Sequence, residues 1–121
     1  ADGGGGGRNP AMGDAQRKIM GDLEELQDIC EQIDVATTYV RVGGFGRLLA
    51  LAGSRAQPDG LRAQAAAVVG TLTQNNPPAQ AVFRSSGGVA SLLAAASHPS
   101  TRPNVRRAVL HALSCSLGGG G

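Results

Sequence analysis

The chain has 121 residues, a net charge of +2 and mostly small side chains. This length suits one domain with one hydrophobic core. The only aromatic residues are Tyr39, Phe45 and Phe83, and β-branched residues are too scattered to form repeated strands. Abundant alanine favours closely packed helices, because alanine has the highest helix propensity. The composition therefore excludes a typical sheet protein and predicts an all-α fold.

The charges are unevenly distributed along the chain. Residues 1–40 carry three basic and eight acidic side chains, a net charge of −5, whereas residues 41–121 carry eight basic and one acidic side chain, a net charge of +7. This asymmetry indicates either two oppositely charged solvated surfaces or a basic surface that docks on an acidic partner. Because the basic part has no set of aromatic residues for base stacking and only a modest charge density, nucleic acid is not an expected partner.

Glycine is concentrated at both ends of the chain. Residues 3–7 and 118–121 are all glycine. These runs have no side chains to bury, so residues 1–9 and 118–121 are expected to be flexible tails. The folded domain between the tails is then expected to span residues 10–117.

Three helices are predicted first along the domain. Over residues 14–33, apolar residues recur every three or four positions, which is typical of one helix face; they are Ile19, Leu23, Leu26, Ile29, Cys30 and Ile33. Asp34 is expected to open a short second helix. That helix should end at Gly43 and Gly44, because glycine readily adopts the left-handed conformation past a helix end. Residues 45–54 form the third predicted helix.

Four more helices are predicted to follow. Residues 61–75 place five apolar residues on one face: Leu61, Ala65, Val68, Val69 and Leu72. A short helix begins at Pro77 and stops before Gly87 and Gly88, and residues 89–97 and 105–117 complete the set. The expected N-caps are Asp14, Asp59 and Asn76. Pro77 suits a first helical position, where its missing N–H costs nothing.

The predicted helices repeat along the chain. A shift of 44 residues places Gly43-Gly44 on Gly87-Gly88 and Leu48-Leu49 on Leu92-Leu93. The repeat divides the domain into a partial unit (14–42, aligned after a small deletion), a unit (43–86) and a second partial unit (87–117). A period of forty-odd residues with three helices per unit is typical of armadillo or HEAT repeats. We therefore expect a right-handed superhelix of about two and a half three-helix repeats, the alternative being a non-repeating bundle.

Three segments resemble a particular armadillo family. They are "ELQDICEQIDVATTYVRVGGF", "GLRAQAAAVVGTLTQNNPPAQAVFRSSGGVASLL" and "VRRAVLHALSCSL". They look like successive repeats of the nucleotide exchange factors of the 70 kDa heat shock chaperones (heat-shock-protein-binding protein or Fes type). The run "GTLTQNNP" joined to "GGVASLL" is the stronger mark. The resemblance implies a cytoplasmic co-chaperone that binds the chaperone's ATPase domain and promotes ADP release. An armadillo-type protein-protein interaction scaffold without exchange activity is the alternative.

The resemblance also places a partner-binding surface. In an armadillo stack, the third helix of each repeat lines the concave face. The polar side chains expected there are Gln64, Thr71, Gln74, Asn75, Arg106, Arg107 and His111. Amides, a hydroxyl, an imidazole and guanidinium groups can hydrogen-bond a partner, and arginine suits bidentate pairing with carboxylates. The alternative is that these residues are ordinary solvated positions.

No enzyme, cofactor, metal or small-molecule substrate is expected. His98 and His111 lack sequence neighbours that would complete a nucleophile, base and orienter set. The glycine runs lack the lysine and hydroxyl residue of a phosphate loop. Cys30 and Cys115 lie in apolar helical patterns, so we expect buried free thiols rather than a disulfide or metal site. No apolar run approaches a membrane span and no secretory leader opens the chain, so neither a membrane partner nor secretion is expected.

Overall fold

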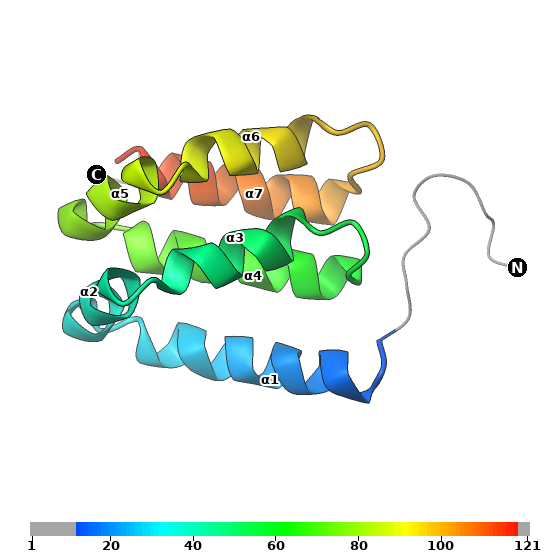
Figure 1. Cartoon of the computed structure of the whole chain (residues 1–121), viewed down its shortest axis with the longest axis horizontal. Coiled ribbons are helices and arrows are strands. Elements are labelled where there is room, and N and C mark those ends of the chain that lie inside the picture. The colour runs from blue at the N-terminus through cyan, green and yellow to red at the C-terminus, as the bar shows by residue number, and fades with distance from the viewer. Residues whose placement is uncertain (1–11, 119–121) are drawn as a thin grey trace, which may run out of the picture.

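The computed structural model describes residues 12–118, which contain seven α-helices and no strand (Figure 1). The all-α prediction is therefore confirmed over this range. The helices are α1 (Asp14–Ile29), α2 (Ile33–Arg41), α3 (Gly44–Gly53), α4 (Asp59–Thr73), α5 (Pro77–Ser85), α6 (Gly88–Ser97) and α7 (Pro103–Ser116). The expected flexible tails at residues 1–9 and 118–121 lie outside the described residues except for Gly118, whose N–H donates a hydrogen bond to the carbonyl oxygen of Cys115 at 3.3 Å.

The helix boundaries repeat with the predicted period. Both ends of α2 lie 44 residues before the corresponding ends of α5, and the same is true of α3 and α6. The first residue of α4 lies 44 positions before the first residue of α7. The three-residue connection between α1 and α2 also matches the one between α4 and α5 in length. The sequence period is thus a period of helices and turns, and the small deletion expected in the first partial unit is not present.

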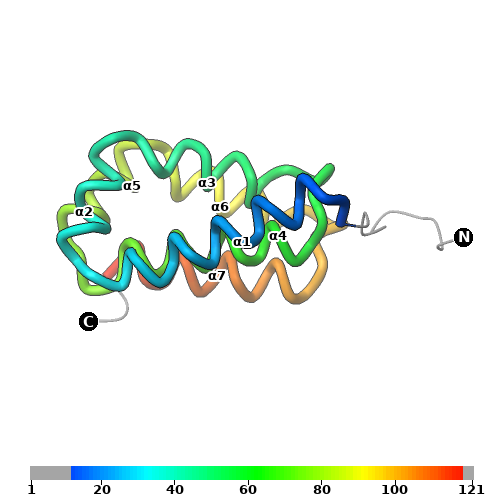
Figure 2. Tube along the Cα trace, turned by 90° about the horizontal axis from the view of Figure 1, so that it is seen from below, coloured from blue at the N-terminus to red at the C-terminus, as the bar shows by residue number. Residues whose placement is uncertain are grey.

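Helices at equivalent places in the period stack on one another. The long helices α1, α4 and α7 lie side by side in one row, and α3 and α6 form a second row in front of α4 and α7 (Figures 1 and 2). The short helices α2 and α5 pack together at one end of both rows. The structural unit is therefore a short transverse helix followed by an antiparallel pair of longer helices: α2, α3 and α4 form one such unit, and α5, α6 and α7 form the next.

The corners between helices form as local chemistry dictates. Gly43 and Gly87 both adopt left-handed backbone conformations, with φ of 94° and 77°, which glycine reaches without a steric penalty. Asn76 is the N-cap of α5, and its Oδ1 accepts a hydrogen bond from the Ala79 N–H at 3.3 Å. Pro77 occupies the first helical position, as predicted. The predicted turns at "QNNPP" and "GG" are therefore confirmed.

Four predicted details of the helix ends are wrong. The first helix ends at Ile29, and Ile33 rather than Asp34 begins α2. The side chains of Ile29 and Ile33 are 50% and 55% exposed, so they do not extend the buried face. Gly13 and Pro58 are the N-caps of α1 and α4, not Asp14 and Asp59. The two aspartates instead occupy the first helical turn, where their negative charge interacts favourably with the positive end of the helix dipole.

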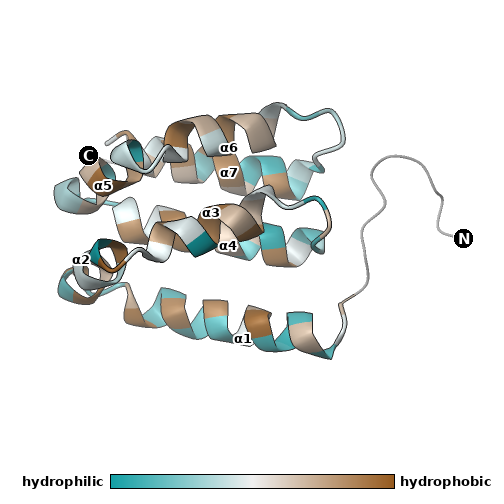
Figure 3. Ribbon diagram, viewed as in Figure 1, coloured by the Kyte–Doolittle hydropathy of each residue, from teal (hydrophilic) through white to brown (hydrophobic). Residues whose placement is uncertain are grey.

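The hydrophobic core runs through both rows. Leu61, Ala65, Val68, Val69 and Leu72 of α4 are all fully buried, as the spacing predicted. Phe45 and Phe83, from successive units, meet edge to face with ring centroids 5.4 Å apart. In Figure 3, brown apolar segments alternate with teal hydrophilic segments along α1. Within residues 12–118, none of the helices combines the length and apolar character needed to cross a membrane.

Candidate partner-binding surface

Two of the predicted residues, Gln64 and Thr71 of α4, form hydrogen bonds with the same side chain of the neighbouring helix α1. Gln64 of α4 donates a hydrogen bond from Nε2 to Oε1 of Gln27 on α1, with a distance of 2.7 Å. Gln27 in turn donates from its Nε2 to Oγ1 of Thr71, at 3.0 Å. All three side chains are partly buried. This hydrogen-bonded bridge fixes α1 beside α4 and sets the orientation of polar groups that a partner would meet.

The other half of the surface lies where α7 approaches α4. Gly70 has no side chain, and a Cβ at this position would lie 3.5 Å from Cδ2 of His111 and 3.8 Å from Sγ of Cys115. His111 is exposed, and its Nε2 lies 3.6 Å from Sγ of Cys115, one turn further along α7. The Cys115 side chain is buried. His111 is therefore the polar group that α7 presents beside Gly70.

The surface changes its charge from α1 to α7. The sequence of α1 contains five acidic and two basic residues, whereas α7 contains two arginines and no acidic residue. Glu24 and Asp28 of α1 are exposed, and so is Arg107, one turn before His111 on α7. Because α4 lies between the two helices, acidic and basic groups occupy opposite edges of one surface. A partner with charges in the complementary order would be oriented as well as attracted.

Arg106 performs a structural task. Its Nε donates to the carbonyl oxygen of Ala96 at 2.9 Å, and its Nη2 donates to that of His98 at 3.3 Å. One period earlier, Nε of Arg62 donates to the carbonyl oxygen of Ala52 at 3.0 Å. The last carbonyls of a helix lack partners within that helix, so each arginine stabilises the C-terminus of the helix before its own. Burial lowers the pKa of Arg62, while the nearby Asp59 acts in the opposite direction.

The last two predicted residues lie at the turn after α4. Gln74 is the C-cap of α4, and Asn75 follows it with a φ of 53°, a left-handed conformation that asparagine tolerates better than most residues. Both are exposed. Asn76 is buried instead, and its Nδ2 donates to Oγ1 of Thr37 on α2 at 3.2 Å. The turn thus presents two amides outward while the third fixes α2 against α5.

The structure brings together part of the predicted set. Gln64 and Thr71 share one hydrogen-bonded bridge, and His111 lies across Gly70 from them. Arg106 is turned toward backbone carbonyls. Gln27 was missed, although a signal existed: it precedes Thr71 by 44 residues, one full period. Extending the period into the first partial unit would have found it.

The described part of the chain contains two thiols, those of Cys30 and Cys115. Burial raises the pKa of both the Cys30 and the Cys115 thiol, so both stay protonated and weakly nucleophilic near neutral pH. Both cysteines are free and buried, as the sequence predicted. Within residues 12–118, no three histidine, cysteine or acidic side chains gather closely enough to hold a metal ion.

Comparison with known proteins gives no assignment: no family model matches the chain, and no curated protein sequence matches it significantly. The interpretation of the surface therefore depends on the residues and contacts of this chain.

Proposed function

We propose that this protein binds the ATPase domain of a 70 kDa heat shock chaperone in the cytoplasm and promotes ADP release. The observation that carries the proposal is the 44-residue period, which joins helix boundaries, turn residues and contacts. The "QNNPP" turn belongs to that period and is also the main sequence mark of the resemblance. The chain would then be an armadillo-type stack of about two and a half units with a right-handed superhelical course.

The arrangement of the rows supports an armadillo-type stack. In such a stack, each unit covers the apolar faces of its neighbours, and the core forms between units rather than within one. Here α4 packs against α1 and α7, α3 packs against α6, and α2 packs against α5. In a non-repeating bundle, contacts between helices that lie one period apart in the sequence would not be expected.

The proposed mechanism is differential binding by the surface of α1, α4 and α7. Its charge gradient would orient one lobe of the chaperone domain, with the Gln27–Gln64–Thr71 bridge at the centre and Arg107 and His111 at the basic edge. Holding that lobe in an orientation that fits ADP poorly would accelerate ADP release. Thermodynamic linkage then requires ADP to weaken the complex by the same factor.

The alternative is a protein-protein interaction scaffold without exchange activity. It is favoured by the end of the stack, where Leu93 and Leu110 are 48% and 49% exposed. The residue one period before Leu93 is Leu49, which is only 8% exposed because the next unit covers it. Exposed leucines grouped at one end suit contacts with another protein surface. Both functions use binding alone.

Release of a fluorescent ADP from the chaperone ATPase domain tests the proposal. The full chain is expected to accelerate release in a concentration-dependent manner in stopped-flow measurements. Arg107→Glu should reduce the acceleration about tenfold or more, because the charge reversal affects the proposed basic edge. Arg84→Glu, an equal charge change at an exposed position of α5, should leave it unchanged. The proposal fails for this chain if the wild type neither forms a complex nor accelerates release.

A further inference from the structure

A small pocket lies between the two successive units, where the end of α3 and the start of α4 meet α6. Its volume is about 220 Å³, smaller than the roughly 300–1,000 Å³ of sites for drug-sized ligands. Arg55 and Arg62 line it from the first unit, and Ser91, Ala94 and His98 line it from the second. The pocket therefore suits a small polar group that would contact both units at once.

Arg62 is the buried cation of this pocket, with only 4% of the residue exposed. Its Nε donates a hydrogen bond to the carbonyl oxygen of Ala52. One period later, Arg106 uses both Nε and Nη2 to donate to carbonyl oxygens. Among the residues that the structure describes, no such hydrogen bond occupies the Nη atoms of Arg62. Because buried charged groups need hydrogen-bond partners, these two Nη groups are donors available to a ligand.

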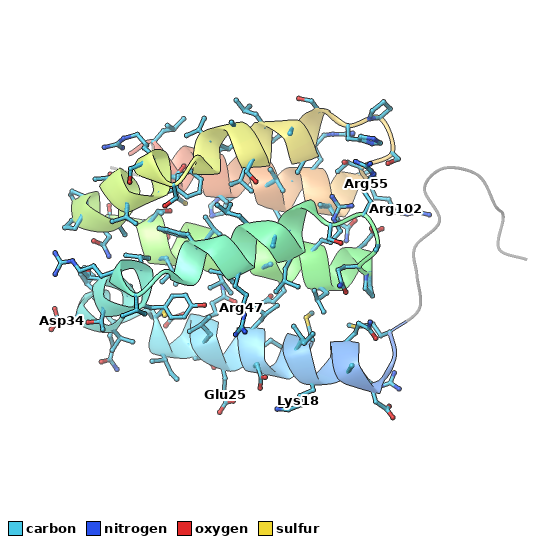
Figure 4. The ribbon with its side chains drawn as sticks, in the orientation of Figure 1. Lys18, Glu25, Asp34, Arg47, Arg55 and Arg102 are labelled. Carbon is cyan, nitrogen blue, oxygen red and sulfur yellow. The ribbon has the colours of Figure 1, made fainter. Side chains whose placement is uncertain are left out.

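The pocket also has an excess of positive charge. Asp59 is the only acidic residue among residues 41–121, and its Oδ2 lies 3.0 Å from Nε of Arg102. In the described part of the chain, neither Arg55 nor Arg62 forms an ion pair. Burial lowers the pKa of Arg62, Asp59 raises it, and the charge of Arg55 lowers it again. Figure 4 shows Arg55 and Arg102 at the same end of the helical rows. An anion held by Arg55 and Arg62 would offset the repulsion between them.

The other two polar side chains of the pocket can also donate hydrogen bonds. Nδ1 of His98 accepts a hydrogen bond from the Ser100 N–H at 3.1 Å. The neutral imidazole therefore carries its proton on Nε2, which makes Nε2 a donor. Ser91 adds a hydroxyl group, which can donate as well as accept. All four polar side chains that line the pocket thus match an anion with several acceptor oxygens.

We propose that this pocket binds the phosphate group of a phosphate monoester. Such a group carries a charge of about −1.5 to −2 near neutral pH and three strong acceptor oxygens. It therefore matches two guanidinium groups, whereas the single charge of a carboxylate would leave one of them uncompensated. Arginine also pairs with phosphate through two parallel hydrogen bonds. The phosphate can belong to a phosphorylated residue or to a small molecule, because the pocket recognises the group that both share. The site does not depend on the chaperone assignment.

A phosphate titration of the full isotope-labelled chain tests the proposal. Sodium phosphate should cause saturable NMR shifts centred on Gly53, Arg55, Ser91 and His98. Sodium chloride at the same ionic strength should not cause them, because it only screens surface charge. Phosphate should also raise the midpoint of thermal unfolding, since a ligand that binds only the folded state stabilises it. Sodium acetate should bind at least about tenfold more weakly, because it carries one charge fewer than the phosphate dianion.

A second titration distinguishes the two sources of phosphate. Its probe is a pentapeptide with phosphoserine between two pairs of glycines, and the same peptide with serine is its control. If the natural ligand is a phosphorylated residue, the phosphopeptide should shift the same signals at least as tightly as inorganic phosphate does. If it is a small molecule, inorganic phosphate should bind and the phosphopeptide should bind more weakly. Either result supports the pocket as a phosphate site.

Two pairs of variants separate the pocket from general charge effects. Arg55→Gln should weaken phosphate binding about tenfold, because it removes a charged donor. Arg84→Gln removes an equal charge at an exposed position of α5 and should leave binding unchanged. Ala94→Glu should abolish saturable binding, because it adds a carboxylate at the exposed border of the pocket. Ala81→Glu makes the same change at an exposed position of α5 and should have no effect.

Three results would overturn the proposal. The first is a set of shifts that does not saturate, or that chloride reproduces at the same ionic strength. The second is phosphate binding that survives both Arg55→Gln and Ala94→Glu. The third is equal affinity for acetate and phosphate, which would contradict the assignment to a doubly charged ligand. The positions of Arg55 and Ala94 are exposed, so these variants are expected to fold and the test stays decisive.

Discussion

Phe83→Ala is expected to lower the free energy of unfolding by about 3–5 kcal/mol. The Phe83 ring is fully buried, packs edge to face on Phe45 of the previous unit and lies against Gly88 at the next turn. Its removal would leave a cavity where two units meet, in addition to the lost apolar burial. Equilibrium unfolding in urea, followed by circular dichroism, measures the change.

Leu93→Ala is the control for this prediction. Leu93 is an apolar residue of similar volume in the neighbouring α6, but half of its side chain is exposed. Its replacement should cost less than about 1 kcal/mol, the usual range for surface substitutions. If Phe83→Ala costs no more than Leu93→Ala, the packing of α5 and α6 between the units is incorrect.

Gly88→Ala is expected to cost about 1–3 kcal/mol, although alanine is the better helix former. Gly88 is the first residue of α6, and a Cβ there would overlap the ring of Phe83. That ring is fully buried, so it can move only by displacing the core side chains around it. Thermal and chemical unfolding of the variant give the stability change.

Two other glycines provide matched comparisons. Gly44 is the equivalent residue one period earlier, and its Cβ would overlap the ring of Tyr39. Tyr39 is only partly buried and borders a groove between α1 and α3, so its ring can move and Gly44→Ala should cost less. Gly46 has no atom near its added Cβ, so Gly46→Ala should be neutral or stabilise α3 by up to about 1 kcal/mol. Equal losses at all three glycines would contradict this explanation.

Most of the turns between helices were predictable, because local residues determine them. Gly43 and Gly87 adopt left-handed conformations that few other residues reach easily, and Asn76 and Pro77 cap and begin α5 within four residues of sequence. The end of α1 was not predictable in this way. Residues 30–32 contain no glycine or proline, and the apolar spacing continues through Ile29 and Ile33. Only packing against α4 decides which of these residues is buried.

The candidate surface was predictable in its residue types but not in its contacts. Helical spacing correctly gave the buried face of α4 and thereby the side that carries Gln64 and Thr71. The sequence pattern could not distinguish an arginine directed at solvent from Arg106, whose partners are carbonyls of the preceding helix. It also could not show the pocket between α3 and α6, which depends on how helices far apart in sequence pack.

The affinity of the chain for the chaperone ATPase domain, measured by calorimetry with and without ADP, tests the central proposal most directly. An exchange factor must bind the ADP-loaded domain more weakly than the empty one, by the same factor by which it weakens ADP binding. We predict this reciprocal loss. Equal affinity for the two forms would contradict exchange activity and favour the scaffold, and the absence of binding to either form would contradict the chaperone assignment.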